Sequence, residues 1–194
     1  VVGDLDSEST KAQNFREGEE PDGTSGILRI TQDGLPVNDT GILGNGRPLN
    51  LYYAYGIRNS FGIDFDPITG KLWDTENGPS YGDEINLVEP GFNSGWKAIS
   101  GKLWSSSVGV TSGIGDTLED FDGKGKYSDR EYEWSETVGP TAIKFFNSDK
   151  LGKQYENDLF VGDWNNGNIY HLKLNTERTK IIFDSGIEGR LNEK

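Results

Sequence analysis

The chain has no cysteine, a single histidine and no long apolar run, and each shortage excludes a class of protein. Without cysteine it cannot form a disulfide, use a thiolate nucleophile or build a cysteine-ligated zinc site. No apolar run approaches the roughly 20 residues of a membrane-spanning helix, so we expect no membrane span.

Positive charge is also scarce, because 19 Lys and Arg face 32 Asp and Glu, a net charge of -13. A polyanion would meet an acidic surface with no compensating basic patch, so we expect no nucleic-acid partner. An acidic balance suits Ca²⁺, which takes hard oxygen ligands, although the same charge also keeps an ordinary protein in solution.

Glycine and aromatic residues are abundant, with 27 Gly, five Trp, eight Tyr and nine Phe. Short stretches of alternating apolar and polar residues lie between turn sequences, and no long helical period is present, which indicates an all-β protein. The expected strands span residues 1–5, 26–31, 61–65, 71–74, 84–88, 141–146, 158–164, 168–174 and 179–184.

One pattern recurs along the chain. Val-Gly-Asp at 2–4 appears again at 161–163, Leu-Trp-Asp at 72–74 takes the same place in the central stretch, and each is followed by a turn-rich connection and a strand. Three copies predict a repeat architecture built from four-stranded antiparallel blades, as in a β-propeller.

We interpret the chain as a single partial-propeller domain. The first copy lacks the strand that should precede the repeated core, so we expect the chain to begin inside a blade. The expected parts are the end of one blade (1–34), a central blade (52–96), an inter-blade insertion (97–137), a further blade (138–185) and the start of the next (186–194).

The central stretch carries three motifs in a fixed order. These are Gly-x-Arg-Asn-x-x-Gly at 56–62, Asp-Pro-x-Thr-Gly-x-Leu-Trp at 66–73, and Glu-Asn-Gly-Pro followed by Asp-Glu-Ile-Asn-Leu at 76–87. Together they resemble the soluble PQQ-dependent sugar dehydrogenases, also called glucose/sorbosone or aldose sugar dehydrogenases. The resemblance implies a six-bladed propeller, of which this chain would be about half. It also implies a calcium- and PQQ-dependent oxidation of an aldose to its lactone, with electrons passed to an external acceptor.

The resemblance assigns cofactor contacts to Arg58, Asn59, Asn77, Asn165 and Arg190. A guanidinium is a permanent cation with a planar donor fork that suits carboxylates and quinone oxygens, and an Asn amide offers both a donor and an acceptor. Taken alone, the first two residues would sooner be explained by an Arg paired with a nearby carboxylate and an Asn capping a turn.

The resemblance places calcium on the backbone carbonyls of Gly78 and Pro79, and a further calcium at Asp83 and Glu84. The alternatives are a plain Asn-Gly-Pro turn and, for Glu84, a buried structural carboxylate. Neighbouring strand residues point to opposite faces, so one ion need not contact both carboxylates.

A second calcium candidate lies at 120–131, where acidic and polar residues take several positions of an EF-hand loop: Asp120, Asp122, Gly125, Ser128 and Glu131. Lys124 stands where an oxygen ligand is expected, and no flanking helices are evident. We favour a solvated acidic loop.

Two positions depart from the glucose-oxidising members of the family: Asn165 replaces a Lys and Asn192 replaces a second Arg. Two fewer cations leave weaker contacts to an anionic cofactor. Trp164 could supply an apolar wall for a sugar ring, although aromatic residues in blades belong to the core more often.

The family's catalytic base is a His in a His-Asn-Gly-Gly stretch. The only histidine here, His171, lies inside an expected strand, where we expect a structural role. The base is therefore expected upstream of Val1, and the isolated chain is expected to be inactive.

Two other functions are considered. A non-catalytic ligand- or protein-binding propeller would have the same fold, since fold does not determine function. A calcium-dependent lactone hydrolase would need an inward-facing Glu, Asn and Asp set that the chain does not offer. A periplasmic or extracellular location is implied by the resemblance alone, and the sugar, the electron acceptor and the oligomeric state stay open.

Overall fold

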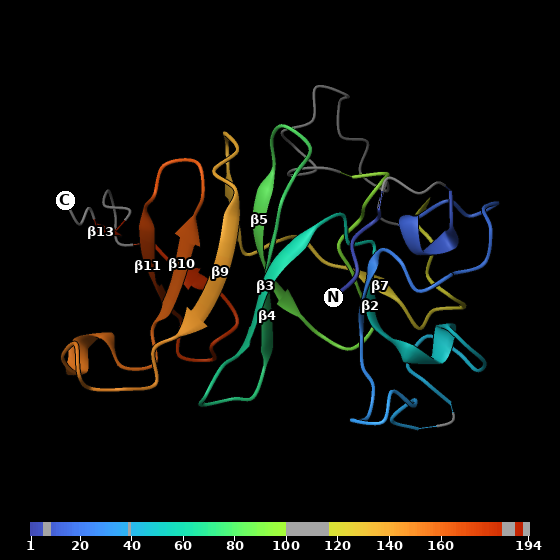
Figure 1. Cartoon of the computed structure of the whole chain (residues 1–194), viewed down its shortest axis with the longest axis horizontal. Coiled ribbons are helices and arrows are strands. Elements are labelled where there is room, and N and C mark those ends of the chain that lie inside the picture. Colours follow the sequence, from blue (N-terminus) through green and yellow to red (C-terminus); the bar gives the residue numbers. More distant parts are fainter. Residues whose placement is uncertain (6–8, 39, 100–116, 184–188, 192–194) are drawn as a thin grey trace. The chain divides into compact units, whose positions relative to one another are not determined.

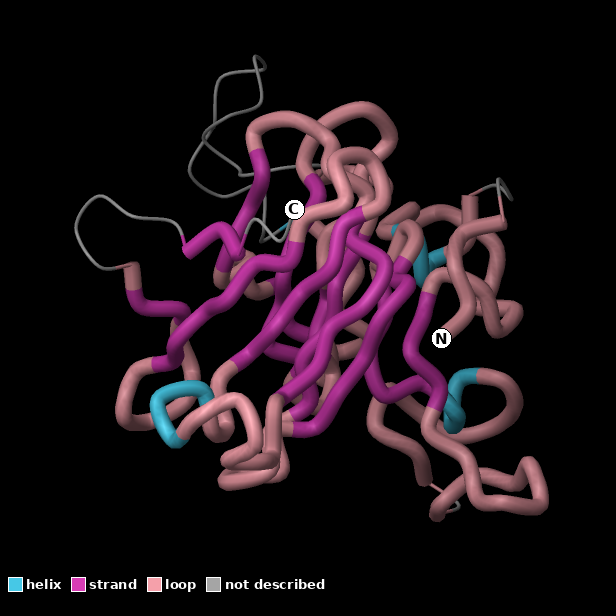
Figure 2. Tube along the Cα trace, turned by 60° about the vertical axis from the view of Figure 1, so that its left-hand side comes forward, coloured by secondary structure: helices cyan, strands magenta, loops and turns pink. Residues whose placement is uncertain are grey.

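A computed structural model describes residues 1–5, 9–38, 40–99, 117–183 and 189–191. In these ranges the chain consists of β-strands and loops with three single-turn 3-10 helices, η1 (Lys11–Gln13), η2 (Leu49–Leu51) and η4 (Lys153–Tyr155), which are cyan in Figure 2. The expectation of an all-β protein is confirmed. No helix in the described part of the chain has the length and apolar character needed to cross a membrane.

The chain forms two compact units, each made of two separate stretches. The first unit consists of residues 1–60 and 89–129, and the second consists of residues 61–88 and 130–194. The polypeptide therefore passes between the units after residues 60, 88 and 129.

The first unit has one sheet with the strand order β1-β2-β6-β7, formed by β1 (Gly26–Leu28), β2 (Tyr52–Tyr55), β6 (Phe92–Asn93) and β7 (Lys126–Tyr127). β1 and β2 are antiparallel, whereas β2–β6 and β6–β7 are parallel. The expectation of antiparallel blades is thus wrong for this sheet. Parallel neighbours require long crossovers, and more than 30 residues separate each parallel pair along the chain.

A small aromatic core supports this sheet. Tyr52, Tyr55, Leu43 and Phe121 are buried together, and the rings of Tyr55 and Phe121 meet edge to face at 4.9 Å between centroids. Such pairs add to the stabilisation that comes from burying apolar area.

The first sheet of the second unit has the order β3-β4-β5-β8, formed by β3 (Ser60–Phe65), β4 (Leu72–Glu76), β5 (Asp83–Val88) and β8 (Tyr132–Trp134). β5 is antiparallel to both neighbours. The strands expected at 61–65, 71–74 and 84–88 are confirmed. β8, however, comes from the stretch that was expected to be an insertion. The sequence did not predict this strand, because its three alternating residues stand among Gly, Ser and acidic residues.

The second sheet of this unit has the order β12-β11-β10-β9, and Figure 1 shows β9, β10 and β11 side by side. Its strands are β9 (Pro140–Phe145), β10 (Leu159–Asp163), β11 (Ile169–Leu174) and β12 (Ile181–Ile182), and β13 (Gly189–Leu191) also pairs with β11. The pairs are antiparallel. Strands were expected in four of these places and are confirmed.

The two sheets of the second unit share one hydrophobic core. Trp73 and Ile85 come from the first sheet, and Phe145, Leu159 and Val161 come from the second. The alternation of each strand directs these side chains to one face, where β4 lies against β9.

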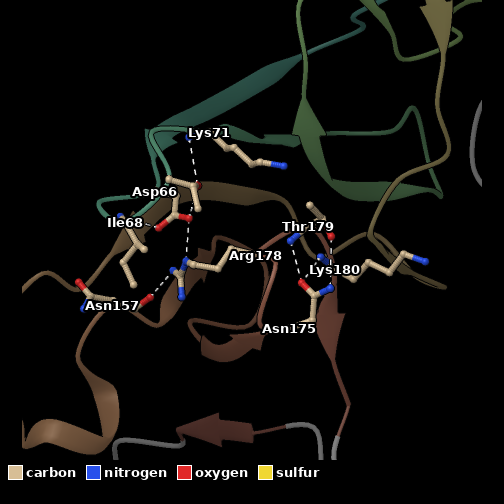
Figure 3. A network of polar contacts seen from close by, with 9 residues as sticks. Asp66, Ile68, Lys71, Asn157, Asn175, Arg178, Thr179 and Lys180 are labelled. Atoms are coloured by element: carbon tan, nitrogen blue, oxygen red, sulfur yellow. Dashed lines mark hydrogen bonds and ion pairs between the residues drawn. The ribbon is translucent and has the colours of Figure 1, made fainter.

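The turn between β3 and β4 is fixed by a buried carboxylate, Asp66, shown in Figure 3. Asp66 accepts hydrogen bonds from the Ile68 backbone N–H at 3.1 Å and from the Arg178 Nε at 2.7 Å. Arg178 also donates to the Asn157 carbonyl at 2.6 Å. One ion pair therefore ties the first sheet to a loop of the second.

Candidate cofactor and metal site

Three loops of the second unit are joined by hydrogen bonds: 77–82 between β4 and β5, 135–139 between β8 and β9, and 164–168 between β10 and β11. Loops carried by rigid strands are where binding residues concentrate. Most of the predicted site residues of this unit lie on these loops or directly beside them.

Asp83 is the centre of the connection between the loops. It begins β5, and the side chain is buried, with 1% of the residue exposed. Its Oδ1 accepts the Gly78 N–H at 2.8 Å, and its Oδ2 accepts the N–H groups of Val138 and Gly139 at 2.7 and 2.8 Å. Sequence reasoning expected a calcium ligand here; the structure shows a carboxylate that binds three backbone donors.

The predicted cofactor residues Asn77 and Asn165 bind the same middle loop. The Asn77 Nδ2 donates to the Pro140 carbonyl at 3.0 Å. Asn165 donates from its backbone N–H to the Val138 carbonyl at 3.0 Å and from Nδ2 to the Thr137 carbonyl at 2.9 Å. The structure thus brings Asn77, Asn165 and Asp83 together around residues 137–140. Sequence reasoning missed this segment, although its Gly-Pro pair is an ordinary turn signal.

Gly78 and Pro79 lie on a tight part of the 77–82 loop. A Cβ at Gly78 would stand 1.9 Å from the Tyr81 carbonyl oxygen, so the loop can close in this way only around a glycine. Pro79 is exposed. Backbone carbonyls on such a loop are the hard oxygen donors that Ca²⁺ takes, so these residues fit the expected metal contact.

Glu84 differs from its neighbour Asp83. It is buried, and its Oε1 accepts a hydrogen bond from the Arg130 Nη1 at 3.1 Å, while the Arg130 Nε lies 3.4 Å from the Glu133 Oε2. Burial raises the pKa of Glu84, the Arg130 charge opposes the rise, and the charges of Asp74 and Glu133 add to it. This geometry supports the structural alternative for Glu84. Among the described residues, no three His, Asp or Glu side chains are grouped so that they could hold a metal ion.

Arg58 and Asn59 belong to the first unit and lie between β2 and β3. The Arg58 guanidinium lies over the Trp96 ring, 5.5 Å from its centroid. The Trp96 Nε1 donates to the Asp4 Oδ2 at 2.8 Å, and the Asp4 N–H donates to the Arg58 carbonyl at 2.8 Å. Asp4 and Trp96 therefore position the arginine, a role that the sequence alone did not reveal.

The remaining predicted residues fall at the end of the chain and on the 164–168 loop. Arg190 lies on β13, opposite Tyr170, and Asn192 lies outside the described residues. Trp164 is 80% exposed, so it does not belong to the core. Beside the loops is a polar cavity of about 540 Å³, lined by residues 132–138 with Asn166, Asn168 and Tyr170.

His171 has the surroundings of a structural residue. Its Nε2 lies 2.7 Å from the Asp158 Oδ2, and its ring stacks on Phe160 with centroids 4.9 Å apart. These contacts agree with the role expected from its place in a strand.

The stretch 120–131 does not have the form of an EF-hand loop. Within the described ranges no α-helix flanks it: β7 lies inside the stretch and β8 follows it directly, while the Gly125 N–H donates to the Asp120 carbonyl at 2.7 Å. These contacts support the interpretation as an acidic loop.

The chain is similar in sequence to several bacterial proteins. Aldose sugar dehydrogenase YliI of Escherichia coli K12 is 27% identical over 164 residues, covering 82% of this chain and 42% of the relative. An uncharacterised protein of Synechocystis sp., slr1608, is 29% identical over 162 residues, covering 83% of this chain and 37% of the relative.

Solved structures agree on the fold. The apo soluble aldose sugar dehydrogenase of E. coli has a TM-score of 0.61 at 23% identity, covering 87% of this chain and 45% of that one. The PQQ-bound aldose sugar dehydrogenase of Streptomyces coelicolor has a TM-score of 0.62 at 21% identity, covering 94% and 42%.

The chain spans less than half the length of these relatives. The family model described as glucose/sorbosone dehydrogenase nevertheless matches residues 2–191, almost the whole chain. Together with the motifs of the central stretch and the loops that carry them, this match shows that the chain belongs to the glucose/sorbosone dehydrogenase family.

Proposed function

We propose that the full-length protein is a PQQ- and calcium-dependent dehydrogenase that oxidises an aldose to its lactone and passes the electrons to an external acceptor. The observation that carries the proposal is the closed Asn77-Gly78-Pro79 loop, which Asp83 and residues 137–140 hold in place. The similarity to an aldose sugar dehydrogenase of E. coli and to a PQQ-bound one of S. coelicolor supports the substrate class and the cofactor.

The sheets support a propeller as the scaffold. In the second unit two sheets pack face to face around one core, as neighbouring blades do. Phe61, Ile63 and Phe65 alternate along β3, share one of its faces, and are 62%, 43% and 61% exposed, which is unusual for three large apolar residues on one face. We infer that this chain is about half of a six-bladed ring and that the remaining blades cover such surfaces.

Each site residue then has a role. The carbonyls of Gly78 and Pro79 hold the calcium, and Arg58 and Asn59 hold and orient the anionic cofactor. When bound, PQQ would supply a hydride acceptor for the sugar C1, and calcium would supply Lewis-acid chemistry beside it. The base that takes the hydroxyl proton is a histidine outside this chain, since His171 is engaged with Asp158.

Reconstitution tests the proposal. The full-length protein with PQQ and Ca²⁺ is expected to reduce a dye when aldoses are added, and to lose that activity with Arg58→Ala or on calcium chelation. Arg47→Ala, which removes an exposed guanidinium of the same unit, is the control and should keep the activity. Activity that survives both the Arg58 change and chelation would reject the mechanism.

The second candidate is a non-catalytic binding propeller, which the replacement of two cations by Asn165 and Asn192 favours. The sequence upstream of Val1 discriminates between the two. A His followed by Asn-Gly-Gly supports catalysis, and its absence supports binding. Export to the periplasm or the medium is proposed from the family alone, and cell fractionation tests it.

A further inference from the structure

Asp83 differs from Asp66 and Asp163 of the second unit because its side chain binds the backbone N–H groups of two separate loops. Asp163 accepts the N–H groups of Asn166 and Asn168, at 2.8 and 3.2 Å, and therefore stabilises its own turn. Asp66 accepts the Ile68 N–H within its own turn, at the other end of β4, and it reaches a second loop only through the side chain of Arg178. Asp83 instead joins the loop before β5 to the separate loop before β9.

The Oδ1 contact restricts the loop that carries the expected metal carbonyls. With the Gly78 N–H held at 2.8 Å, the peptide at residue 78 cannot rotate freely, and the Tyr81 carbonyl limits the opposite side of the same residue. Because a peptide group is planar, fixing the Gly78 N–H fixes the Asn77 carbonyl, and together with the Tyr81 contact it restricts the Gly78 backbone from which the next carbonyl extends.

The Oδ2 contacts extend the restriction to a third loop. Val138 and Gly139 donate to Asp83 through their N–H groups, and their carbonyls accept the N–H groups of Asn165 and Trp164 at 3.0 and 2.9 Å. One carboxylate therefore orders the 77–82, 135–139 and 164–168 loops as a set.

We propose that Asp83 is a positioning residue: it holds the Gly78 and Pro79 carbonyls in a calcium-binding arrangement through backbone hydrogen bonds and does not itself ligate the metal. The identity of the ligand rests on the proposed function, whereas the ordering of the loops does not. Positioning of this kind is worth 10- to 100-fold in metal affinity at other sites.

The test uses Asp83→Asn in the full-length protein, with Asp66→Asn as a matched control. Both aspartates are 1% exposed, and both accept several hydrogen bonds in the same unit. An Asn keeps the shape but replaces one acceptor oxygen by a donor. Hydrogen–deuterium exchange on the calcium-free protein and calcium titration by calorimetry are the two measurements.

For Asp83→Asn we expect exchange at least about tenfold faster in peptides covering 76–82 and 136–140, and calcium affinity about tenfold weaker. Asp66→Asn should leave both unchanged, even where it lowers the melting temperature equally. If Asp83→Asn does not fold, Asp83→Glu keeps the charge but displaces the oxygens by one methylene, and the same paired changes are expected.

Two outcomes would overturn the proposal. Loss of calcium affinity with unchanged exchange would make Asp83 a direct ligand, and faster exchange with unchanged affinity would show that the loops do not position the metal site. If the unmodified protein binds neither calcium nor PQQ, the proposed function fails, while the exchange measurement still decides whether Asp83 orders the loops.

Discussion

Three buried aspartates stabilise loops and turns of the second unit. Asp66, Asp83 and Asp163 each accept two or more hydrogen bonds from nearby backbone or side-chain donors. For Asp66 and Asp163 these hydrogen bonds outweigh the effect of burial and lower the pKa below its ordinary value. The protonation of these two side chains is therefore linked to the stability of the turns that they hold.

Asp66 gives a pH prediction. Burial alone would raise its pKa, but the hydrogen bonds from Arg178, Thr69 and Ile68 outweigh it and lower the pKa below the ordinary value. A carboxyl with a lower pKa in the folded state stabilises the protein above its unfolded pKa of about 4, and that stabilisation is lost as the pH falls through the folded pKa.

Asp66→Asn should therefore lower the free energy of unfolding by about 2 kcal/mol at pH 7 and flatten its fall below about pH 4. Urea unfolding between pH 3 and 7 measures both effects. Asp33→Asn changes an exposed carboxylate of the first unit and is expected to leave the pH profile unchanged. If the Asp66 variant lost stability below about pH 4 as steeply as the unmodified protein, Asp66 would not be the source of this pH dependence.

Gly78 gives a prediction about the site itself. Gly78→Ala places a Cβ against the Tyr81 carbonyl, so the loop must open and calcium affinity should fall at least about tenfold. Gly162→Ala is the control, because its Cβ would have no atom within 4 Å. Calorimetric titration compares the two, and equal affinities would show that the closed loop is not needed for binding.

At the scale of elements, the shared core of the second unit carries the stability of both sheets. Leu159 on β10 is fully buried between neighbours on β9 and β11. Leu159→Ala should cost about 3 kcal/mol through the lost transfer energy and the cavity left behind. Leu151→Ala, at a position 60% exposed, should cost less than about 0.5 kcal/mol, and urea unfolding compares them. Similar losses for both would argue against a shared core.

The alternation of apolar and polar residues was enough to predict the longer strands, because each has one face on a core. The same alternation did not predict the strands whose pairing depends on distant parts of the chain. β6 and β7 have two residues each, too few for any period, and their parallel pairing depends on crossovers through other elements. β8 shows three alternating residues within an acidic loop sequence, which is too weak a signal.

Sequence analysis named several residues that the structure brings together, but it could not give their contacts, and their binding roles stay predictions. Asn77, Gly78, Asp83 and Asn165 do lie in one hydrogen-bonded set of loops. The sequence could not show that Asp83 binds backbone N–H groups, because a carboxylate at a strand start suits a metal and a turn equally. Residues 137–140 carry no charged side chain, and their contribution comes from the backbone.

At the scale of the whole molecule, both units are discontinuous in sequence, since residues 61–88 of the second unit lie between the two stretches of the first. During synthesis, the sheet β1-β2-β6-β7 cannot close until residue 127 has left the ribosome, by which time β3, β4 and β5 have already emerged. β5 in turn waits for its outer partner β8, five residues further on. β3, β4 and β5 of the second unit can therefore pair before the sheet of the first unit is complete, and no single cut in the chain separates the two units from each other.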